Sequence, residues 1–413
     1  MVAIAMVWGS LVACGDDDGN SDGNRTGSSQ DAGPGPGDSG GGPTRPERAY
    51  LIGQRFNTPD GRVGYMGIFP ELPSEPIEVS GLFELPDAGG RLWVCGENVF
   101  QNNGGNNRIE KYLIGDDLSI TPAESLLIGE EGIEGGAFST VCVSSTQAYM
   151  FSRDASRGVE FNPETMVILD SFDIPAPPLE DGLPAAIFEG ETIGNLSYFS
   201  VRGVNFGELR YSTRAIVATF DSSDESWTYT TYDGCASSIN GSRGDDGSFF
   251  LDPGSEHGLF LELSEQAETT EACSLRIPPG TREFDPASFA AVPGNVRSSY
   301  PISDDFLFVQ RIAQSAPPAD PDALGAWFSY PVDNFRVDRE TGTSTPYSGL
   351  NDQAVENGRR VEIDGRRLVQ MRVLNSEGGT ERTELFELLP DGPSAAPVIT
   401  VIGGDVLRLT RVW

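Results

Sequence analysis

The sequence of 413 residues contains one histidine, one lysine and no C-x-x-C motif. A single histidine, His257, cannot supply the histidine cluster typical of catalytic zinc sites, and the cysteine spacing argues against thiolate metal or redox chemistry. Basic residues are also few, 28 against 62 acidic residues, which gives a formal charge of −34. Because nucleic-acid binding needs clustered Lys and Arg, we expect no nucleic-acid partner.

Long apolar runs are missing as well. Residues 2–13 are apolar or small, which is typical of a signal peptide and falls short of the ~20 residues that span a bilayer. The segment ends in Leu11-Val12-Ala13-Cys14, which resembles a bacterial lipobox. We therefore expect residues 1–13 to be a signal peptide and Cys14 to carry lipid. The alternative is an ordinary signal peptide with an incidental cysteine, since no positive charge precedes the segment.

Residues 14–48 are rich in Gly, Pro, Ser and Asp and carry almost no apolar side chains. Such a segment cannot bury enough apolar surface to offset the entropy of ordering, so we expect a flexible tether between the lipidated cysteine and a domain over residues 49–413. We place this domain at the cell envelope, on the periplasmic side of the outer membrane or at the cell surface, with the membrane as a partner through the lipid.

Four further cysteines lie in the domain, at Cys95, Cys142, Cys235 and Cys273. An even number in an exported protein indicates two disulfides, for which three pairings are possible. We favour Cys95–Cys142 and Cys235–Cys273, because each pair is separated by about one structural repeat.

One pattern recurs seven times along the domain: a short alternating strand that ends in an aromatic residue or leucine, a polar turn, and a second alternating strand. The predicted copies cover residues 67–79, 109–128, 159–169, 215–231, 259–277, 327–342 and 385–402. Upstream strands are predicted at residues 91–95, 148–151, 249–251, 306–309 and 367–371. Residues 313–321 read as an inserted surface loop.

Seven repeats of about four strands each predict an all-β fold, a seven-bladed β-propeller. The first module lacks an innermost strand, whereas residues 406–412 form a strand left over after the seventh. We therefore predict that the C-terminal strand pairs into the first blade and closes the ring. The alternative is a β-sandwich pair or two smaller β-domains.

No residue stands out as catalytic. His257 lies in a polar turn, and the adjacent acidic pairs Asp245-Asp246 and Asp304-Asp305 read as solvated turns, although they leave a calcium site or an acid–base role open. The sequence therefore identifies no cofactor, with calcium as the one candidate.

The modules, above all residues 148–151 leading to residues 161–165 and 168–170, resemble bacterial seven-bladed propellers of the YVTN/YncE-like type. With the lipobox, the opening residues 49–52 and 63–65 look similar to MxcI-like lipoproteins, which are associated with siderophore uptake. The resemblance implies a propeller fold and a role in iron uptake. No ligand-binding residue transfers with it.

The leading hypothesis is a non-catalytic, monomeric propeller, anchored by lipid, that binds a small-molecule chelate or an envelope protein. The alternative is an exported hydrolase or lyase that uses carboxylates or calcium in the central channel. Convergent carboxylates at the channel mouth would favour the enzyme, whereas an arginine and aromatic funnel would favour capture of an anionic chelate. A purely structural surface role also remains open.

Overall fold

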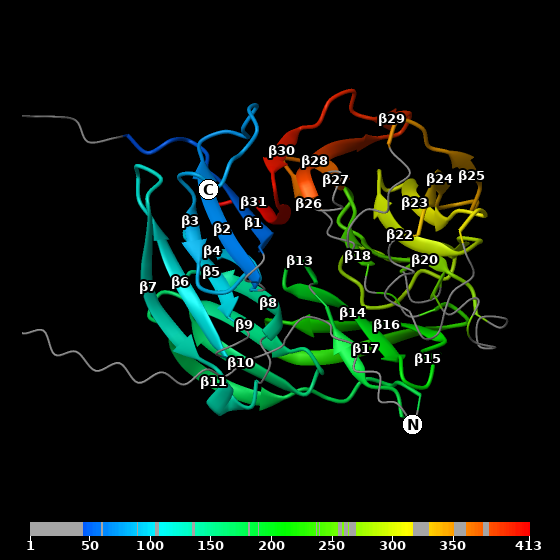
Figure 1. The fold of residues 1–413 in the computed structure, drawn as a ribbon. Helices are drawn as coiled ribbons and strands as arrows, with labels where there is room; N and C mark the ends of the chain where they lie inside the picture. Colours follow the sequence, from blue (N-terminus) through cyan, green and yellow to red (C-terminus); the bar gives the residue numbers. More distant parts are fainter. Residues whose placement is uncertain are drawn as a thin grey trace, which may run out of the picture.

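The computed structural model describes residues 44–413 except residues 59, 60, 89, 104–106, 134–136, 181, 189, 237, 239, 255–257, 260–262, 264–269, 317–329, 351–360 and 375–379. In this part of the chain, seven antiparallel sheets are arranged radially about a central axis (Figure 1). The predicted all-β, seven-bladed β-propeller is confirmed.

Each blade is a sheet of four main strands, which follow one another from the centre of the ring outward. Blade 1 contains β31 (Asp405–Arg411), β1 (Tyr50–Thr58), β2 (Gly61–Phe69) and β3 (Phe83–Leu85). Blade 2 contains β4 (Leu92–Cys95), β5 (Asn98–Asn103), β6 (Arg108–Ile114) and β7 (Ile120–Leu127), followed by the 3₁₀ turn η1 (Gly129–Glu131). Blade 3 contains β8 (Ala137–Ser144), β9 (Gln147–Ser152), β10 (Arg157–Asn162) and β11 (Val167–Asp173).

Blades 4 to 7 follow the same plan with small additions. Blade 4 contains β12 (Ala185–Ile187), β14 (Leu196–Asn205), β16 (Arg214–Asp221) and β17 (Ser226–Asp233), with β13 (Glu191–Ile193) and β15 (Arg210–Tyr211) on β14. Blade 5 contains β18 (Asn240–Arg243), β19 (Phe249–Asp252), β20 (Cys273–Ile277) and β21 (Ala290–Ala291). Blade 6 contains β22 (Val296–Pro301), β23 (Phe306–Ile312), β24 (Val332–Asp338) and β25 (Ser344–Pro346). Blade 7 contains β26 (Val361–Ile363), β27 (Arg366–Leu374) and β28 (Thr380–Leu389), with β29 (Gly392–Pro393) and β30 (Ile399–Ile402) on β28.

The C-terminal strand closes the ring, as predicted. β31 pairs antiparallel with β1, with Tyr50 opposite Arg411 and Arg55 opposite Asp405. The backbone N–H of Val412 donates to the carbonyl oxygen of Ala49 at 2.7 Å, which extends the pairing beyond the strand. Closure joins the two ends of the domain, so that blade 1 does not present an unpaired inner edge.

The core lies between adjacent blades. Trp93 of blade 2 stacks on Phe100 at a ring-centroid distance of 4.4 Å and meets the edge of Phe161 of blade 3 at 6.1 Å. All three side chains are buried, and they belong to one apolar cluster that joins the two blades. Burying a large apolar side chain contributes ~1.5–3 kcal/mol, so these contacts hold neighbouring sheets together.

Both favoured disulfides are present. Cys95–Cys142 joins the innermost strands β4 and β8 of adjacent blades, with a Cα–Cα distance of 5.5 Å. Cys235–Cys273 joins the segment before β18 to β20, with a Cα–Cα distance of 5.8 Å. The first bridge thus links two blades, and the second links the segment that leads into blade 5 to the third strand of that blade.

Two predicted modules differ from the structure. Residues 76–79 are not the outer strand of blade 1; that strand is β3, and Ile77 instead forms a parallel bridge to Val401 of blade 7. The reason is that Pro73 and Pro76 lack the N–H groups that a ladder needs. In the fifth module we predicted a pair of outer strands, with residues 273–277 as the second strand of the pair. Leu259 is helical instead, and residues 273–277 form the third strand of blade 5.

The strand order defines two faces. In every blade the innermost strand begins at the same end of the sheet as the connection between the second and third strands. Thus Asp405 lies opposite Arg55 in blade 1, and Ala186 lies opposite Arg202 in blade 4. We call this end, which includes Arg91 and Arg153, the entry face. The turn at Gly96 between β4 and β5 lies on the opposite face.

Candidate ligand-binding site

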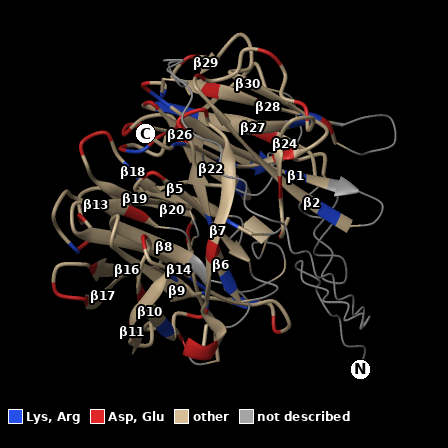
Figure 2. Cartoon of the chain, turned by 90° about the vertical axis from the view of Figure 1, so that its left-hand side faces the viewer, with Lys and Arg blue, Asp and Glu red and all other residues tan. Residues whose placement is uncertain are grey.

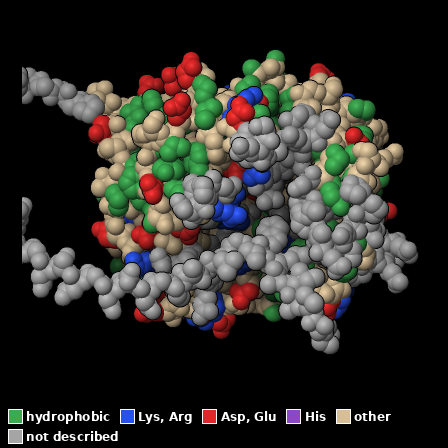
Figure 3. Space-filling model, viewed as in Figure 1, with side chains coloured by type: hydrophobic (Ala, Val, Ile, Leu, Met, Phe, Trp, Pro, Cys, Tyr) green, Lys and Arg blue, Asp and Glu red, His purple; other side chains and the backbone are tan. Residues whose placement is uncertain are grey.

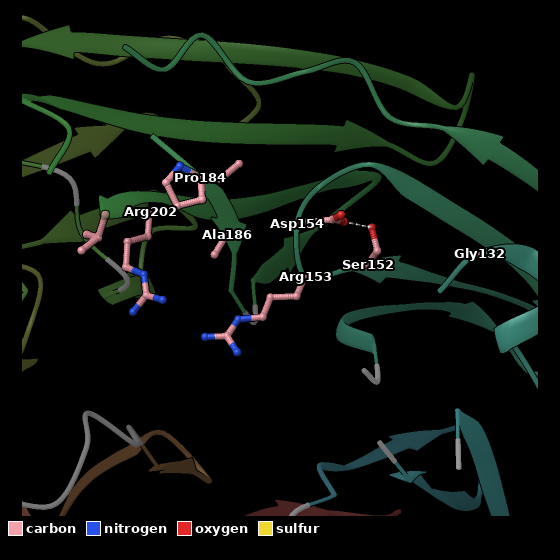
Figure 4. Close-up of a pocket in the computed structure, with 9 residues that line it drawn as sticks. Gly132, Ser152, Arg153, Asp154, Pro184, Ala186 and Arg202 are labelled. Atoms are coloured by element: carbon pink, nitrogen blue, oxygen red, sulfur yellow. Dashed lines mark hydrogen bonds between the residues drawn. The ribbon is translucent and has the colours of Figure 1, made fainter. Parts of the chain in front are cut away.

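A cavity of about 420 Å³ opens on the entry face between blades 3 and 4. Its walls come from the turn after β9, from β12 and from the end of β14 (Figure 4). The lining residues are Gly132, Ser152, Arg153, Asp154, Pro184, Ala185, Ala186, Arg202 and Val204.

A tight turn carries Arg153 into this cavity. The Asp154 carboxylate accepts hydrogen bonds from the hydroxyls of Ser152 and Ser156, both at 2.7 Å, and Ala155 adopts a positive φ of 57°. The backbone N–H of Ser156 donates to the same carboxylate at 3.2 Å, and side-chain to backbone bonds of this kind are typical of turns that contain Asp. The carbonyl oxygen of Arg153 also accepts the N–H of Ile187 at 2.8 Å, which fixes the turn of blade 3 against the inner strand of blade 4.

Arg153 and Arg202 share one aromatic ring. The Arg202 guanidinium carbon lies 4.9 Å from the ring centroid of Phe188, and that of Arg153 lies 5.9 Å from the same centroid. Figure 4 shows the two arginine side chains pointing into the same open space from different blades. Two cations that line the cavity therefore lie against one phenyl ring.

The Arg153 side chain is half-buried and lies near two other arginines. Burial lowers the pKa of Arg153, and the neighbouring charges of Arg202 and Arg91 lower it further. Asp154 is the one acidic side chain among the described lining residues. Burial alone would raise the pKa of Asp154, but hydrogen bonds from Ser156 and Ser152 hold this pKa below its usual range. The Asp154 carboxylate is therefore ionised and bonded to residues of its own turn.

The cavity is unusual for a chain of charge −34. Figure 2 shows acidic residues spread over turns and strand ends. In Figure 3, basic side chains lie beside the hollow at the middle of the view, while most visible acidic side chains lie toward the rim. On the face in view, some of the basic side chains thus lie next to the hollow.

The acidic pairs identified in the sequence lie elsewhere, on the opposite face, and three of their four carboxylates contact an arginine. Arg367 donates to Asp245 at 2.8 Å and to Asp304 at 3.3 Å, and Arg276 pairs with Asp246. The backbone N–H of Asp245 also donates to the Asp304 carboxylate. This network joins blades 5, 6 and 7. In the described part of the chain, no three His, Cys, Asp or Glu residues gather as metal ligands would.

Two further sequence candidates, the lipidation residue Cys14 and the turn residue His257, lie outside the described residues. None of the helices in the described ranges has the length and apolar character needed to cross a membrane.

The cavity arginines were not among the residues predicted from the sequence, although a repeat signal marks them. In five blades an arginine follows a buried Gln or Ser by one or two residues near the end of the second strand. The pairs are Gln54 with Arg55, Ser152 with Arg153, Ser200 with Arg202, Gln310 with Arg311, and Gln370 with Arg372. Arg311 differs from the cavity residues because it packs over Phe335 and donates to Ser344 within its own blade.

No family model matches the chain, and no curated protein matches its sequence. Among solved structures, the chain is similar to a candidate 6-phosphogluconolactonase from Bacteroides uniformis, with a TM-score of 0.49, 10% identity, and coverage of 88% of this chain and 99% of that chain. It is also similar to AztD from Citrobacter koseri, with a TM-score of 0.45, 8% identity, and coverage of 88% and 98%. At these values the likeness transfers neither a ligand nor an activity.

Proposed function

We propose that the protein is an exported, lipid-anchored and non-catalytic β-propeller that binds a small anionic ligand in the cavity between blades 3 and 4. The observation that carries this proposal is the convergence of Arg153 and Arg202 on Phe188 at that cavity. Arginine and aromatic side chains are the features that we expected of a site that captures an anionic chelate, and these three side chains support such a site.

The chemistry of the two arginines supports an anionic ligand. A guanidinium presents five N–H donors in a planar fork that suits carboxylate and phosphate oxygens. Two guanidinium groups on one cavity can bind an anion together, each through its own N–H donors. A cavity of about 420 Å³ is large enough for a small organic ligand.

The proposed location of the protein rests on the signal-peptide segment and on the disulfides. Two disulfides favour folding in an oxidising compartment such as the periplasm or the cell exterior. The lipobox-like segment before Cys14 adds the membrane anchor. The resemblance to MxcI-like lipoproteins supports an iron chelate as the most concrete ligand, for uptake by the cell.

Thermal unfolding tests the proposal. Citrate, ferric citrate and calcium are added in turn to the purified chain. An anion at a hundred times its dissociation constant should stabilise the fold by ~2.7 kcal/mol. With ~2.1 cal/mol/K per residue over about 370 residues, this corresponds to a rise in Tm of roughly 3.5 °C. Stabilisation by ferric citrate above that by citrate would support the iron chelate.

Variants of the cavity sharpen the test. Arg202→Gln should lose the anion-dependent rise, whereas Arg366→Gln, which breaks a surface pair with Glu387 on the opposite face, should keep it. Arg153→Met should lose the rise, because the cavity then keeps only one of its two guanidinium groups. Equal anion responses in all four proteins would contradict the proposal. A calcium response reversed by chelator would favour a metal-centred site instead.

A further inference from the structure

A second cavity, of about 350 Å³, opens between blades 1 and 2. Its walls come from the end of β2, from the start of β3 and from the turn that joins β6 to β7. Third strands begin at the entry face, so this turn lies on the opposite face. We call the cavity the rim groove. Its large apolar lining residues are Ile68, Phe69, Leu82, Phe83, Leu118 and Ile120.

These apolar side chains are only partly buried. Figure 3 shows hydrophobic side chains gathered to the left of the central hollow, over the region where Figure 1 draws β2 and β3. An apolar surface of this kind that polar residues border is typical of a protein-interaction site.

Leu118 lines the groove from an unfavourable backbone conformation. Its φ is 66°, in the left-handed region that leucine rarely adopts and that Asn adopts several-fold more often. The side chain nevertheless packs against the apolar cluster shared by blades 1 and 2. The turn therefore presents a leucine to the groove at a cost in backbone energy, where Asn would suit the conformation better.

Acidic side chains border the groove. Asp116 and Asp117 are exposed in the β6–β7 turn, and Asp117 accepts hydrogen bonds from the backbone N–H and the hydroxyl of Ser119, which lines the groove. These hydrogen bonds lower the pKa of Asp117, so its carboxylate is ionised. Glu71 is exposed two residues after Phe69. Within the described ranges, none of the three carboxylates forms an ion pair.

Arg45 shows how this surface holds a cation. Its guanidinium donates to Glu97, in the β4–β5 turn of the same face, at 2.9 Å and lies 4.0 Å from the ring centroid of Trp413. The hydrogen bond to Glu97 raises the pKa of Arg45, and the charge of Asp116 adds to this effect. Trp413 packs against the same apolar cluster as Leu118. Close to the groove, the protein thus already binds one basic side chain between an aromatic ring and carboxylates.

From these features we infer that the rim groove is a docking site for a basic segment of another protein. An apolar side chain of this segment enters the groove, and neighbouring Lys or Arg side chains lie beside Asp116 and Asp117. The inference is independent of the anion cavity, which lies on the entry face.

Charge complementarity selects this occupant. Residues 14–43 of the chain are acidic and carry almost no apolar side chains, so they do not match the groove. Two copies of a chain with a formal charge of −34 repel each other, and an anionic lipid surface is repelled in the same way. A segment that combines basic and apolar side chains matches both the walls of the groove and its border.

Isothermal titration calorimetry on the full chain tests the inference with three peptides that are blocked at both ends. The basic apolar probe is Gly-Lys-Leu-Phe-Lys-Lys-Gly. In the basic polar probe Ser-Ser replaces Leu-Phe, and in the acidic apolar probe Glu replaces each Lys. We expect the basic apolar probe to bind most tightly, with an affinity that falls as NaCl is added. The basic polar probe should bind about tenfold more weakly, because it buries no large apolar side chain. The acidic apolar probe should show no binding.

Two variants remove one feature of the groove each. Leu118→Asn should weaken binding of the basic apolar probe by about tenfold, and the fold is retained because Asn suits the left-handed conformation of this residue. Its matched control is Leu169→Asn, which removes a leucine that is 53% exposed on the outermost strand of blade 3. The control should bind the probe like the parent.

Asp117→Asn tests the charge at the border. The Asn side-chain oxygen can still accept the hydrogen bonds from Ser119, so the turn is kept. Binding of the basic apolar probe should weaken by about two- to fivefold at low salt, and its salt dependence should flatten. The matched control is Asp224→Asn in the β16–β17 turn of blade 4, where Asp224 likewise accepts the backbone N–H of the residue two positions on. This control removes the same charge from the chain and should leave binding unchanged.

Several results would overturn the inference. They are no binding of the basic apolar probe at millimolar concentration, equal binding of the two basic probes, tight binding of the acidic apolar probe, and parent-like affinity in both Leu118→Asn and Asp117→Asn. A dimer of the parent in sedimentation velocity that Leu118→Asn abolishes would assign the groove to a second copy of the chain instead. Arg202→Gln should keep peptide binding, and Leu118→Asn should keep the anion-dependent rise in Tm, so the groove and the anion cavity are tested separately.

Discussion

Removing the charge of Asp405 should weaken the closure of the ring. Asp405 is the first residue of the closing strand, and its buried carboxylate is shared by Arg372 of blade 7 and Arg55 of blade 1. Asp405→Asn keeps the shape of the side chain but leaves the two arginines without this counter-charge. Breaking a buried pair in this way costs roughly 3–5 kcal/mol.

The size of the effect can be converted to temperature. About 370 residues at ~2.1 cal/mol/K each give an unfolding entropy near 0.8 kcal/mol/K, so Asp405→Asn should lower Tm by about 4–6 °C. The matched control is Asp173→Asn, which removes the partner of Arg157 in a pair whose carboxylate is 83% exposed. An exposed pair contributes ~0–1 kcal/mol, so the control should shift Tm by about 1 °C or less.

The assay is thermal and urea unfolding of the three proteins side by side. If Asp405→Asn and Asp173→Asn lose the same small amount of stability, the carboxylate does not hold the closing strand. A triple variant, Asp405→Leu with Arg372→Met and Arg55→Met, should recover much of the loss, because it replaces all three charges of this group by apolar packing.

Two other predictions concern the bridges and the pH response. Replacing both Cys95 and Cys142 by Ser should lower the free energy of unfolding by about 4 kcal/mol in the chain-entropy model, since the bridge closes a 47-residue separation; equal urea midpoints for parent and variant would refute this. A hydrogen bond from the Ser223 hydroxyl and the ion pair with Arg282 lower the pKa of Asp221. A carboxylate whose pKa is lower in the folded state stabilises the fold at pH values above its unfolded pKa of about 3.9. This stabilisation is lost as the pH falls through the folded-state pKa. Asp221→Asn should therefore flatten the decline in Tm below about pH 4, and an unchanged slope would show that Asp221 does not contribute to it.

The fold could be predicted because its signals are local and repeated. Alternating strands such as residues 148–151 and the turn at residues 338–342 recur at a spacing close to that of four strands, and the surplus strand at the C-terminus matches a missing one in blade 1. The misplaced strand at residues 76–79 shows the limit of such patterns. Ile77 alternates as a strand residue would, yet its partner is Val401, more than 300 residues away.

The cavity could not be located in this way, because its residues meet only through tertiary structure. Arg153 and Arg202 are 49 positions apart, and Phe188 lies between them in a segment with no strand signal of its own. The arginines could have been marked as candidates by aligning the second strands of the blades. Their convergence on one ring, however, depends on the angle between neighbouring sheets.

The most direct test is a crystal structure of the chain grown with ferric citrate and with citrate alone. We expect ligand density in the cavity between blades 3 and 4, with carboxylate oxygens within hydrogen-bonding distance of the Arg153 and Arg202 guanidinium groups. An empty cavity in crystals that hold the ligand elsewhere, at carboxylate or backbone groups away from these arginines, would contradict it.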